Sequence, residues 1–239
     1  MFPQSFPISR PSPGSSTEPG TQKKPLFDLL REPFDGLIHG LQRRWARERR
    51  RRKVGRAYDM ALEIARVIPR GSEVLDVGCG NGFIAHHLSA VLDTNVIGID
   101  VMKTTEAPID YRHYDRTNFP VSDQSFDAVL LCYVLHHAQD MSVVLNEVRR
   151  TLRVNGLLVI YEDIPQTWWD KVICFLHNHQ WRARTGDCTF RRPHEWRALF
   201  NSFGLKVMSE RRLSRWRNLA HPVARRLFVL KLTKYQRSV

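Results

Sequence analysis

The stretch Val74–Gly82, read VLDVGCGNG, constrains the fold of this chain more than any other part of its sequence. The segment Glu73–Val77 has the continuous apolar, β-branched character of a strand buried on both faces of a parallel sheet. Three glycines follow within five residues, and they permit a tight turn that a ligand can approach closely. From Phe83 onward, apolar residues recur at helical spacing. A strand, a glycine turn and a helix N-terminus together predict a nucleotide site at the carboxyl edge of a parallel sheet.

Two acidic residues indicate which kind of nucleotide this turn binds. Asp76 lies two residues before the first glycine, where its carboxylate would repel the pyrophosphate of a dinucleotide. It favours a ligand with a positive group, such as the ammonium and sulfonium of S-adenosylmethionine. The glycine spacing is also GxGxG and not the GxGxxG of dinucleotide folds. Asp100 closes a second apolar run, Asn95–Asp100, and could accept hydrogen bonds from both ribose hydroxyls. The alternative is that both acids only terminate strands.

Four strings in order resemble the class I S-adenosylmethionine-dependent methyltransferases, closest to their small-molecule, type 11-like branch. VLDVGCGNG resembles the first motif of that family, and NVIGID its second strand. YDRTNFPVSDQSFDAVLLCYVLHH is similar to the third and fourth motifs, and LRVNGLLVIYED to the turn and fifth strand. The resemblance covers about Gly71–Asp163. It implies an α/β, Rossmann-like fold with a seven-stranded, mostly parallel sheet, helices on both faces and an antiparallel last strand.

The same resemblance implies S-adenosyl-L-methionine as the cofactor. In the family, the position of Asp115 offers a carboxylate to the adenine amino group, and that of Arg116 offers a backbone amide to the ring. An Asx turn is the alternative for Asp115. The residues expected to bind the cofactor are Asp76, Gly78, Cys79, Gly80, Asn81, Gly82, Asp100, Val101, Asp115, Arg116, Cys132 and Tyr133.

The end of the expected strand Phe126–Tyr133 faces the cleft, because ligands bind beyond the carboxyl ends of parallel strands. The string that follows lacks the Asp/Asn-Pro-Pro-aromatic motif of enzymes that methylate base amino groups, so a small-molecule acceptor is favoured. A histidine here could deprotonate a hydroxyl, or could only start the next helix and pack by the adenine. Two acids after the fifth strand could bind the substrate, act as a base or be held by loop amides. The expected catalytic residues are His136, His137 and Glu162.

The segment Pro165–Arg192 is not required by the common fold and is rich in aromatic and cationic residues. Its position after the fifth strand predicts a substrate lid, and its tryptophans suit a ring or prenyl substrate. Cys174, His177 and His179 match the spacing of no closed zinc site, so no metal is expected. The residues expected to contact the substrate are Tyr133, His137, Asp163, Trp168, His177 and His179.

The net charge of +13 is concentrated in two segments. Leu41–Arg56 carries nine Lys or Arg residues against one acid, and Arg211–Arg226 carries six Arg residues and no acid. Such patches attract phosphate in nucleic acid, anionic lipid or a phosphorylated substrate, or they are simply solvated helix faces. The apolar share of 42% is that of a globular protein, and no stretch reaches the ~20 apolar residues of a membrane span.

The sequence divides into three parts. Residues 1–25 are rich in Pro, Ser and Gly and predict a disordered tail. Residues 26–69 predict a basic amphipathic helical region, which Pro33, Gly36 and Gly40 should divide into two short helices or bend. Its part 26–56 could lie on an anionic membrane surface or pack as a lid over the cofactor. Residues 70–239 form the expected methyltransferase domain, with 165–192 as its lid.

These observations predict an enzyme that transfers a methyl group to O, N or C of a small, lipophilic or aromatic acceptor. The alternatives are an RNA methyltransferase that uses the arginine patches and a non-catalytic protein that binds S-adenosylmethionine. Four cysteines without metal spacing and no secretory signal predict reduced thiols and a cytoplasmic protein, peripheral at the membrane if the basic region binds lipid.

Overall fold

The computed structural model describes residues 26–218 and 221–232, with all their side chains except those of 26–38, 184 and 217. The predicted N-terminal tail lies outside this range. Residues up to Arg49 and residues from Arg50 onward group into two compact units. None of the described helices combines the length and the apolar character needed to cross a membrane.

Helix α1 spans Leu26–Ile64 without interruption, so the prediction of two short helices or a bent one is wrong. A glycine within a helix costs only about 1 kcal/mol, and the arginine-rich run that follows consists of good helix formers. The last turns also bury Ala61 and Ile64 in the core of the second unit, which stabilises the helix beyond its propensity.

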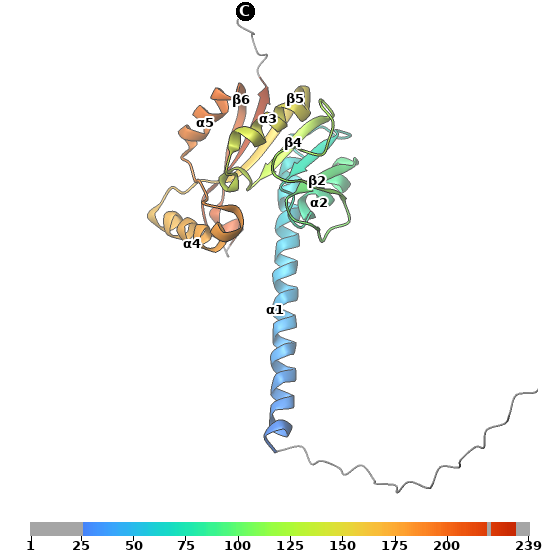
Figure 1. The fold of residues 1–239 in the computed structure, drawn as a ribbon, viewed down its shortest axis with the longest axis vertical. Helices are drawn as coiled ribbons and strands as arrows, with labels where there is room; N and C mark the ends of the chain where they lie inside the picture. The colour runs from blue at the N-terminus through green and yellow to red at the C-terminus, as the bar shows by residue number, and fades with distance from the viewer. Residues whose placement is uncertain (1–25, 219–220, 233–239) are drawn as a thin grey trace, which may run out of the picture. The chain divides into compact units, whose positions relative to one another are not determined.

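The second unit is built on a seven-stranded sheet with the order β3-β2-β1-β4-β5-β7-β6 (Figure 1). All neighbouring strands are parallel except β7, which runs antiparallel to both β5 and β6. The predicted fold class is therefore confirmed. The strands are β1 (Val74–Val77), β2 (Val96–Asp100), β3 (Asp110–His113), β4 (Phe126–Cys132), β5 (Leu152–Asp163), β6 (Leu205–Leu213) and β7 (Arg225–Leu232).

Helices cover both faces of this sheet, because the central strands are apolar on both sides. One core cluster joins the sheet to α3 and α5, with Trp196 and Phe200 fully buried. The other joins the opposite face to α2 and the end of α1. The helices after α1 are α2 (Phe83–Leu92), α3 (Met141–Thr151), α4 (Trp168–Thr185) and α5 (Pro193–Ser202), with short 3₁₀ turns η1 (Leu135–His137) and η2 (Arg215–Arg217).

The passage from α3 into β5 differs from the prediction. The turn expected within the string LRVNGLLVIYED lies inside β5, which begins directly at Leu152. The pairing of β5 with β4 shifts register between Phe126 and Ala128, so the extra residues form an irregularity of the strand instead of a loop. Asn155 lies in this part and has a positive φ of 67°, which asparagine tolerates better than most residues do.

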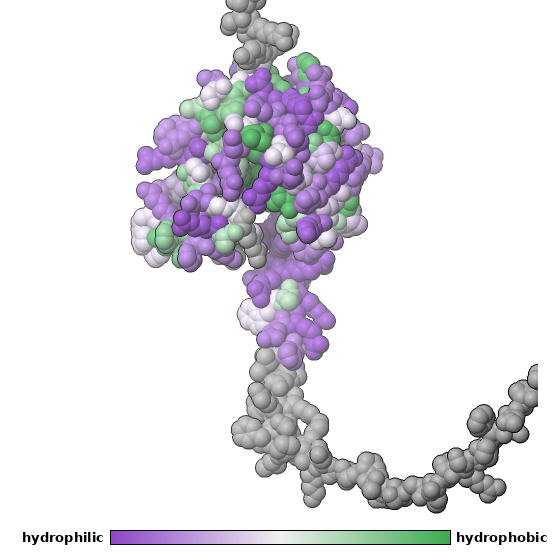
Figure 2. Space-filling view, viewed as in Figure 1, coloured by the Kyte–Doolittle hydropathy of each residue, from purple (hydrophilic) through white to green (hydrophobic). Residues whose placement is uncertain are grey.

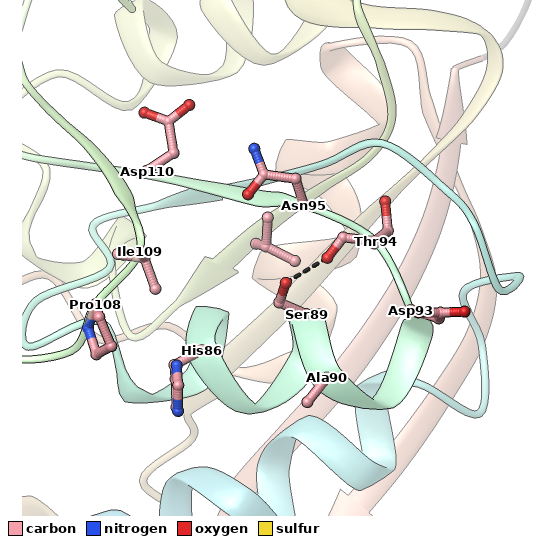
Figure 3. Close-up of a pocket in the computed structure, with 10 residues that line it drawn as sticks. His86, Ser89, Ala90, Asp93, Thr94, Asn95, Pro108, Ile109 and Asp110 are labelled. Carbon is pink, nitrogen blue, oxygen red and sulfur yellow. Dashed lines mark hydrogen bonds between the residues drawn. The ribbon is translucent and has the colours of Figure 1, made fainter.

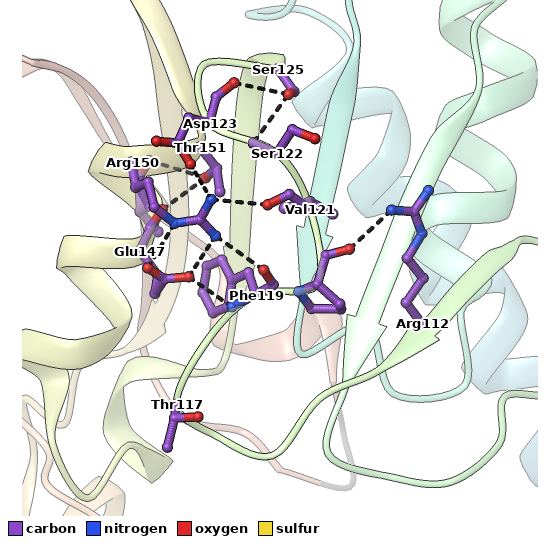
Figure 4. A network of polar contacts seen from close by, with 12 residues as sticks. Arg112, Thr117, Phe119, Val121, Ser122, Asp123, Ser125, Glu147, Arg150 and Thr151 are labelled. Carbon is purple, nitrogen blue, oxygen red and sulfur yellow. Dashed lines mark hydrogen bonds and ion pairs between the residues drawn. The ribbon is translucent and has the colours of Figure 1, made fainter.

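Arg150 on α3 fixes the connection between β3 and β4 (Figure 4). Its guanidinium pairs with Glu147 at 2.7 Å and Asp123 at 2.6 Å, and donates to the carbonyl oxygens of Phe119 at 3.0 Å and Val121 at 2.9 Å. One side chain therefore ties the loop to the helix that precedes β5. This fixes the loop after Asp115, one of the expected adenine contacts.

We expect Arg150→Met to lower the free energy of unfolding by about 1.5–3 kcal/mol, the range for hydrogen bonds that involve charged groups. Methionine keeps the aliphatic stem but leaves the two loop carbonyls without their donor. Urea denaturation measures the loss. Arg70→Met, at an exposed position in the turn before β1, is the matched control and should change stability by less than about 0.5 kcal/mol. Equal losses in both variants would contradict this role of Arg150.

Candidate active site

The glycine turn after β1 has the backbone geometry that only glycines adopt easily. Gly78, Gly80 and Gly82 have φ values of 70°, 55° and 75°. The amides of Gly78 and Cys79 donate to the carbonyl oxygen of Ile99 on β2, at 2.7 and 3.1 Å. A Cβ on Gly78 would lie 2.5 Å from Val134, whereas one on Gly80 would meet no atom within 4 Å. The turn is therefore packed at Gly78 and open to a ligand at Gly80.

Asp76 lies beneath this turn with 1% of its surface exposed. Neither carboxylate oxygen has a hydrogen-bond partner of normal geometry among the described residues. Burial and the neighbouring Asp100 raise the pKa of Asp76 to about 7, although the backbone N–H of Ala85 acts in the opposite direction. A buried carboxylate without a counter-charge fits a ligand that brings a positive group.

Asp100 and Asp115 make the local contacts expected of acids at strand ends. Asp100 accepts from the amides of Gly80 at 2.7 Å and Met102 at 2.9 Å. Asp115 is exposed and accepts from the amide of Thr117 at 3.0 Å, which is an Asx turn. Each carboxylate oxygen can accept a second hydrogen bond, so these contacts are compatible with the expected ribose and adenine contacts.

Residues of α1 that the sequence reasoning did not single out reach the turn. Lys53 donates to the side-chain oxygen of Asn81, whose amide group donates to Glu106. Arg50 pairs with the same Glu106 at 3.3 Å. The sequence indicated these contacts only in general terms, because one interpretation of the basic segment was a lid over the cofactor. Glu106 lies in a polar loop without any motif.

Beyond β4, His136 and Glu162 form a buried pair at the carboxyl edge of the sheet. His136 is 1% and Glu162 0% exposed. Nδ1 of His136 lies 2.6 Å from Oε2 of Glu162, while Oε1 accepts from the amide of Leu135 at 2.8 Å. Burial lowers the pKa of His136, but the negative charge of Glu162 more than offsets this and raises it above its ordinary value. Nε2 of His136 has no partner among the described residues.

His137 and His177 complete a cluster around this pair. Their Nε2 atoms are 3.3 Å apart, and one ring nitrogen from each of His136, His137 and His177 lies within 4.8 Å of the others. Burial and neighbouring histidines lower the pKa of His137 to about 3 and that of His177 to about 4. Three such imidazoles could hold a metal ion. They are not the set weighed from the sequence, because His179 is exposed.

A hollow of about 380 Å³ adjoins the histidine cluster. Cys188 lines it and lies 3.2 Å from Nδ1 of His137, and Phe190 lines it and stacks on His136 at 5.0 Å between ring centroids. Both residues belong to the segment predicted as a lid. The other residues that line the hollow are Pro165, Lys171, Cys174, Phe175, Asn178, Arg191, Arg192 and Glu195.

Three residues that were expected to contact the substrate do not belong to the histidine cluster. Asp163 is buried and engaged by His221 and Arg225, each at 2.9 Å. Trp168 is 63% exposed and stacks on Trp169 with 3.9 Å between centroids, and His179 is also exposed. Sequence reasoning missed His221 and Cys188, which no motif marks.

A second hollow, of about 690 Å³, lies away from this edge (Figure 3). It is lined by the last turn of α2 and by Asn95 and Asp110, which stand at the N-terminal ends of β2 and β3. Ligands of open α/β sheets bind at the carboxyl ends, where Asp76, Asp100 and Glu162 lie.

The sheet order, the glycine turn and the carboxylate beneath it define a class I S-adenosylmethionine-dependent methyltransferase. A family model described as a methyltransferase domain matches residues 45–210, and the chain belongs to this family. Its cofactor is accordingly S-adenosyl-L-methionine.

Relatives and solved structures agree with this class. The chain is 30% identical to the 2-phytyl-1,4-naphtoquinone methyltransferase of Synechococcus elongatus over 156 residues, 59% of this chain and 60% of that protein. It is 28% identical to the demethylmenaquinone methyltransferase of Thermotoga maritima over 152 residues, 59% and 61% of the two chains. The matches thus span about 60% of these relatives' lengths. An S-adenosylmethionine-dependent methyltransferase from Methanosarcina mazei shares the fold, with a TM-score of 0.55 and 19% identity over 72% of this chain and 97% of that one.

We expect the affinity for S-adenosylmethionine to depend on the ionisation of Asp76. With a pKa of about 7, the carboxylate is largely ionised at pH 7.5 and largely protonated at pH 6. Only the ionised form attracts a cation, so Kd should rise about eightfold over this interval. Isothermal titration calorimetry at the two pH values measures this change in Kd. In Asp76→Asn, binding should be weak and independent of pH. A wild-type affinity that stays constant with pH would contradict this role.

Proposed function

We propose that this protein transfers a methyl group from S-adenosylmethionine to a small, lipophilic acceptor with a quinol-like ring. The observation that carries this proposal is the buried histidine–glutamate pair at the carboxyl edge of the sheet, beside a hollow that Phe175 and Phe190 line. Relatives named for the methylation of naphthoquinones support the acceptor class. The acceptor atom is an oxygen or a ring carbon, both of which are nucleophilic in a quinol.

The residues at the glycine turn would hold the cofactor. Bound S-adenosylmethionine supplies a methyl group on a positively charged sulfur, which is activated for in-line displacement. Asp76 would provide the negative charge for its cationic part, Asp100 would bind the ribose and Asp115 the adenine. Lys53 and Arg50, through Asn81 and Glu106, would hold the open side of the turn in place.

The residues of the second half of the sheet would hold the acceptor. The hollow of about 380 Å³ falls within the size range of small-molecule sites, and Phe190 offers an aromatic face for a ring. His136 would present its unpartnered Nε2 to an acceptor hydroxyl, with Glu162 fixing the orientation of the imidazole. Alignment of the acceptor with the methyl group can supply ~7–11 kcal/mol of the barrier reduction, so this chemistry requires few further catalytic groups.

The outer face of α4 supports a lipophilic acceptor taken from a membrane surface. Five large apolar side chains there are 40–69% exposed and recur at spacings that place them on one side of the helix. Figure 2 shows apolar residues on the α4 lobe amid a largely hydrophilic surface. Trp216 is also exposed and lies next to Arg215, which pairs with Asp170 of α4 at 3.1 Å. Tryptophans beside cations suit the interface of an anionic bilayer. The five residues are Trp168, Trp169, Val172, Phe175 and Leu176.

Among acceptors, we expect reduced demethylmenaquinone and naphthoquinol analogues with a free ring position to be methylated, and RNA not to be. Methyl transfer is measured with labelled S-adenosylmethionine and each acceptor in turn. Gly78→Arg should abolish turnover, because even a Cβ at this position would meet Val134 at 2.5 Å. Methylation of RNA alone would select the nucleic-acid alternative. Bound cofactor without turnover on any acceptor would select the non-catalytic one.

We expect the protein to float with vesicles of phosphatidylcholine and phosphatidylglycerol. Replacing Phe175 and Leu176 together by Glu should weaken binding at least tenfold, since each side chain contributes about 1.5–3 kcal/mol when fully buried. Salt should also weaken binding, through the exposed arginines of 43–52. The matched control places the same two charges on α5 as His194→Glu and Ala198→Glu, at exposed positions. Equal flotation of both double variants would refute docking through α4.

A further inference from the structure

Three histidines from two separate elements converge beneath α4. His136 and His137 belong to η1, which follows β4, and His177 lies on α4, forty residues further along the chain. We propose that these three imidazoles bind one divalent transition-metal ion of the Zn²⁺ type. The site lies beside the cofactor turn and uses no residue of it.

The spacing of the nitrogens suits a single ion. Two imidazole nitrogens at 2.0–2.1 Å from a tetrahedral zinc lie about 3.3 Å from each other. Nε2 of His137 and Nε2 of His177 are already 3.3 Å apart. A nitrogen of His136 completes the set within 4.8 Å of the other two, a gap that a small side-chain adjustment closes. Three neutral nitrogens are the ligands that zinc accepts at sites with an open fourth position.

The buried state of His136 is the independent observation that points to a ligand. This side chain is 1% exposed, and its Nε2 lacks any hydrogen-bond partner among the described residues. An unpartnered polar atom in such a place normally destabilises the folded protein. An ion bound to Nε2 would satisfy it.

The contacts behind the histidines are those that metal-binding imidazoles typically have. Nδ1 of His136 lies 2.6 Å from the Glu162 carboxylate, an arrangement that fixes the tautomer and turns Nε2 toward the ion. Nδ1 of His137 lies 3.2 Å from both the Thr185 hydroxyl and the Cys188 sulfur. Two of the three rings are therefore oriented by outer partners. Glu162 also supplies a negative charge close to the ion.

The fourth position of the ion would take an oxygen of the acceptor, so that the ion would stand between Nε2 of His136 and the acceptor hydroxyl and replace their direct contact. Bound to the metal, a quinol hydroxyl loses its proton more readily, because the cation stabilises the resulting oxyanion. The proton then leaves to solvent before the oxygen attacks the methyl group. This role rests on the proposed function, whereas binding of the ion does not.

Metal titration of the full chain tests the site without acceptor or cofactor. The protein is first stripped with a chelator and then titrated with Zn²⁺ and Co²⁺. We expect one Zn²⁺ per chain and visible Co²⁺ absorption bands of tetrahedral intensity. His177→Ala should weaken Zn²⁺ binding at least about 100-fold, because it removes one of three ligands. His179→Ala, an exposed histidine on the same helix, is the matched control and should bind as the wild type does.

Two results would overturn the proposal. One is Zn²⁺ binding of equal strength in His177→Ala and His179→Ala, which would place the ion elsewhere. The other is the absence of stoichiometric binding in a protein that still binds S-adenosylmethionine, which would leave a plain hydrogen bond between the His137 and His177 imidazoles. Neither result bears on methyl transfer. Failure of the metal site is therefore distinguishable from failure of the proposed function.

Discussion

Burial of charge at the carboxyl edge of the sheet is the constraint on which the rest of this structure depends. Asp76 and Glu162 are the penultimate residues of β1 and β5, and both side chains are buried. A buried charge is tolerated only with a partner. Glu162 has His136 at 2.6 Å, whereas no cation among the described residues offsets the burial of Asp76, and its pKa rises to about 7. The protein thus supplies a partner for Glu162 itself, and in the proposed function the partner of Asp76 would be the cofactor.

This difference separates the two halves of the site. The Asp76 half is shaped by backbone, because glycines with positive φ let a ligand come close and the turn offers few side chains. The Glu162 half is shaped by side chains, because η1 and α4 bring imidazoles and aromatic rings together over the sheet edge. A cofactor that the whole family shares suits a site shaped by backbone, whereas a particular acceptor suits a site shaped by side chains.

The same distinction explains how much of each half could be predicted from the sequence. The mostly parallel sheet with its antiparallel last strand was predicted from the resemblance of four strings to one family. The glycine turn and Asp76 were predicted because they lie within one continuous stretch whose period and glycine spacing have a local physical meaning. The contact of His136 with Glu162 joins residues that were each singled out, since both follow strands ending at the same edge. The approach of His177 to His137 could not be predicted, because it depends on how α4 folds back over that edge. The continuity of α1 was mispredicted, because the small helix cost of single glycines was given too much weight beside the helix-forming run that follows them.

In the proposed function, the two faces of α4 would connect the acceptor to a membrane surface. Its inner face carries His177 and Trp181, whose rings approach His137 at 5.2 and 5.7 Å between centroids. Its outer face carries apolar side chains that a helix in a water-soluble enzyme would normally bury or replace. A helix with these two faces can contact lipid through its outer face and cover the proposed acceptor site with its inner face. A lipophilic acceptor then needs to pass only across the width of one helix, about 10–12 Å, to reach the histidines.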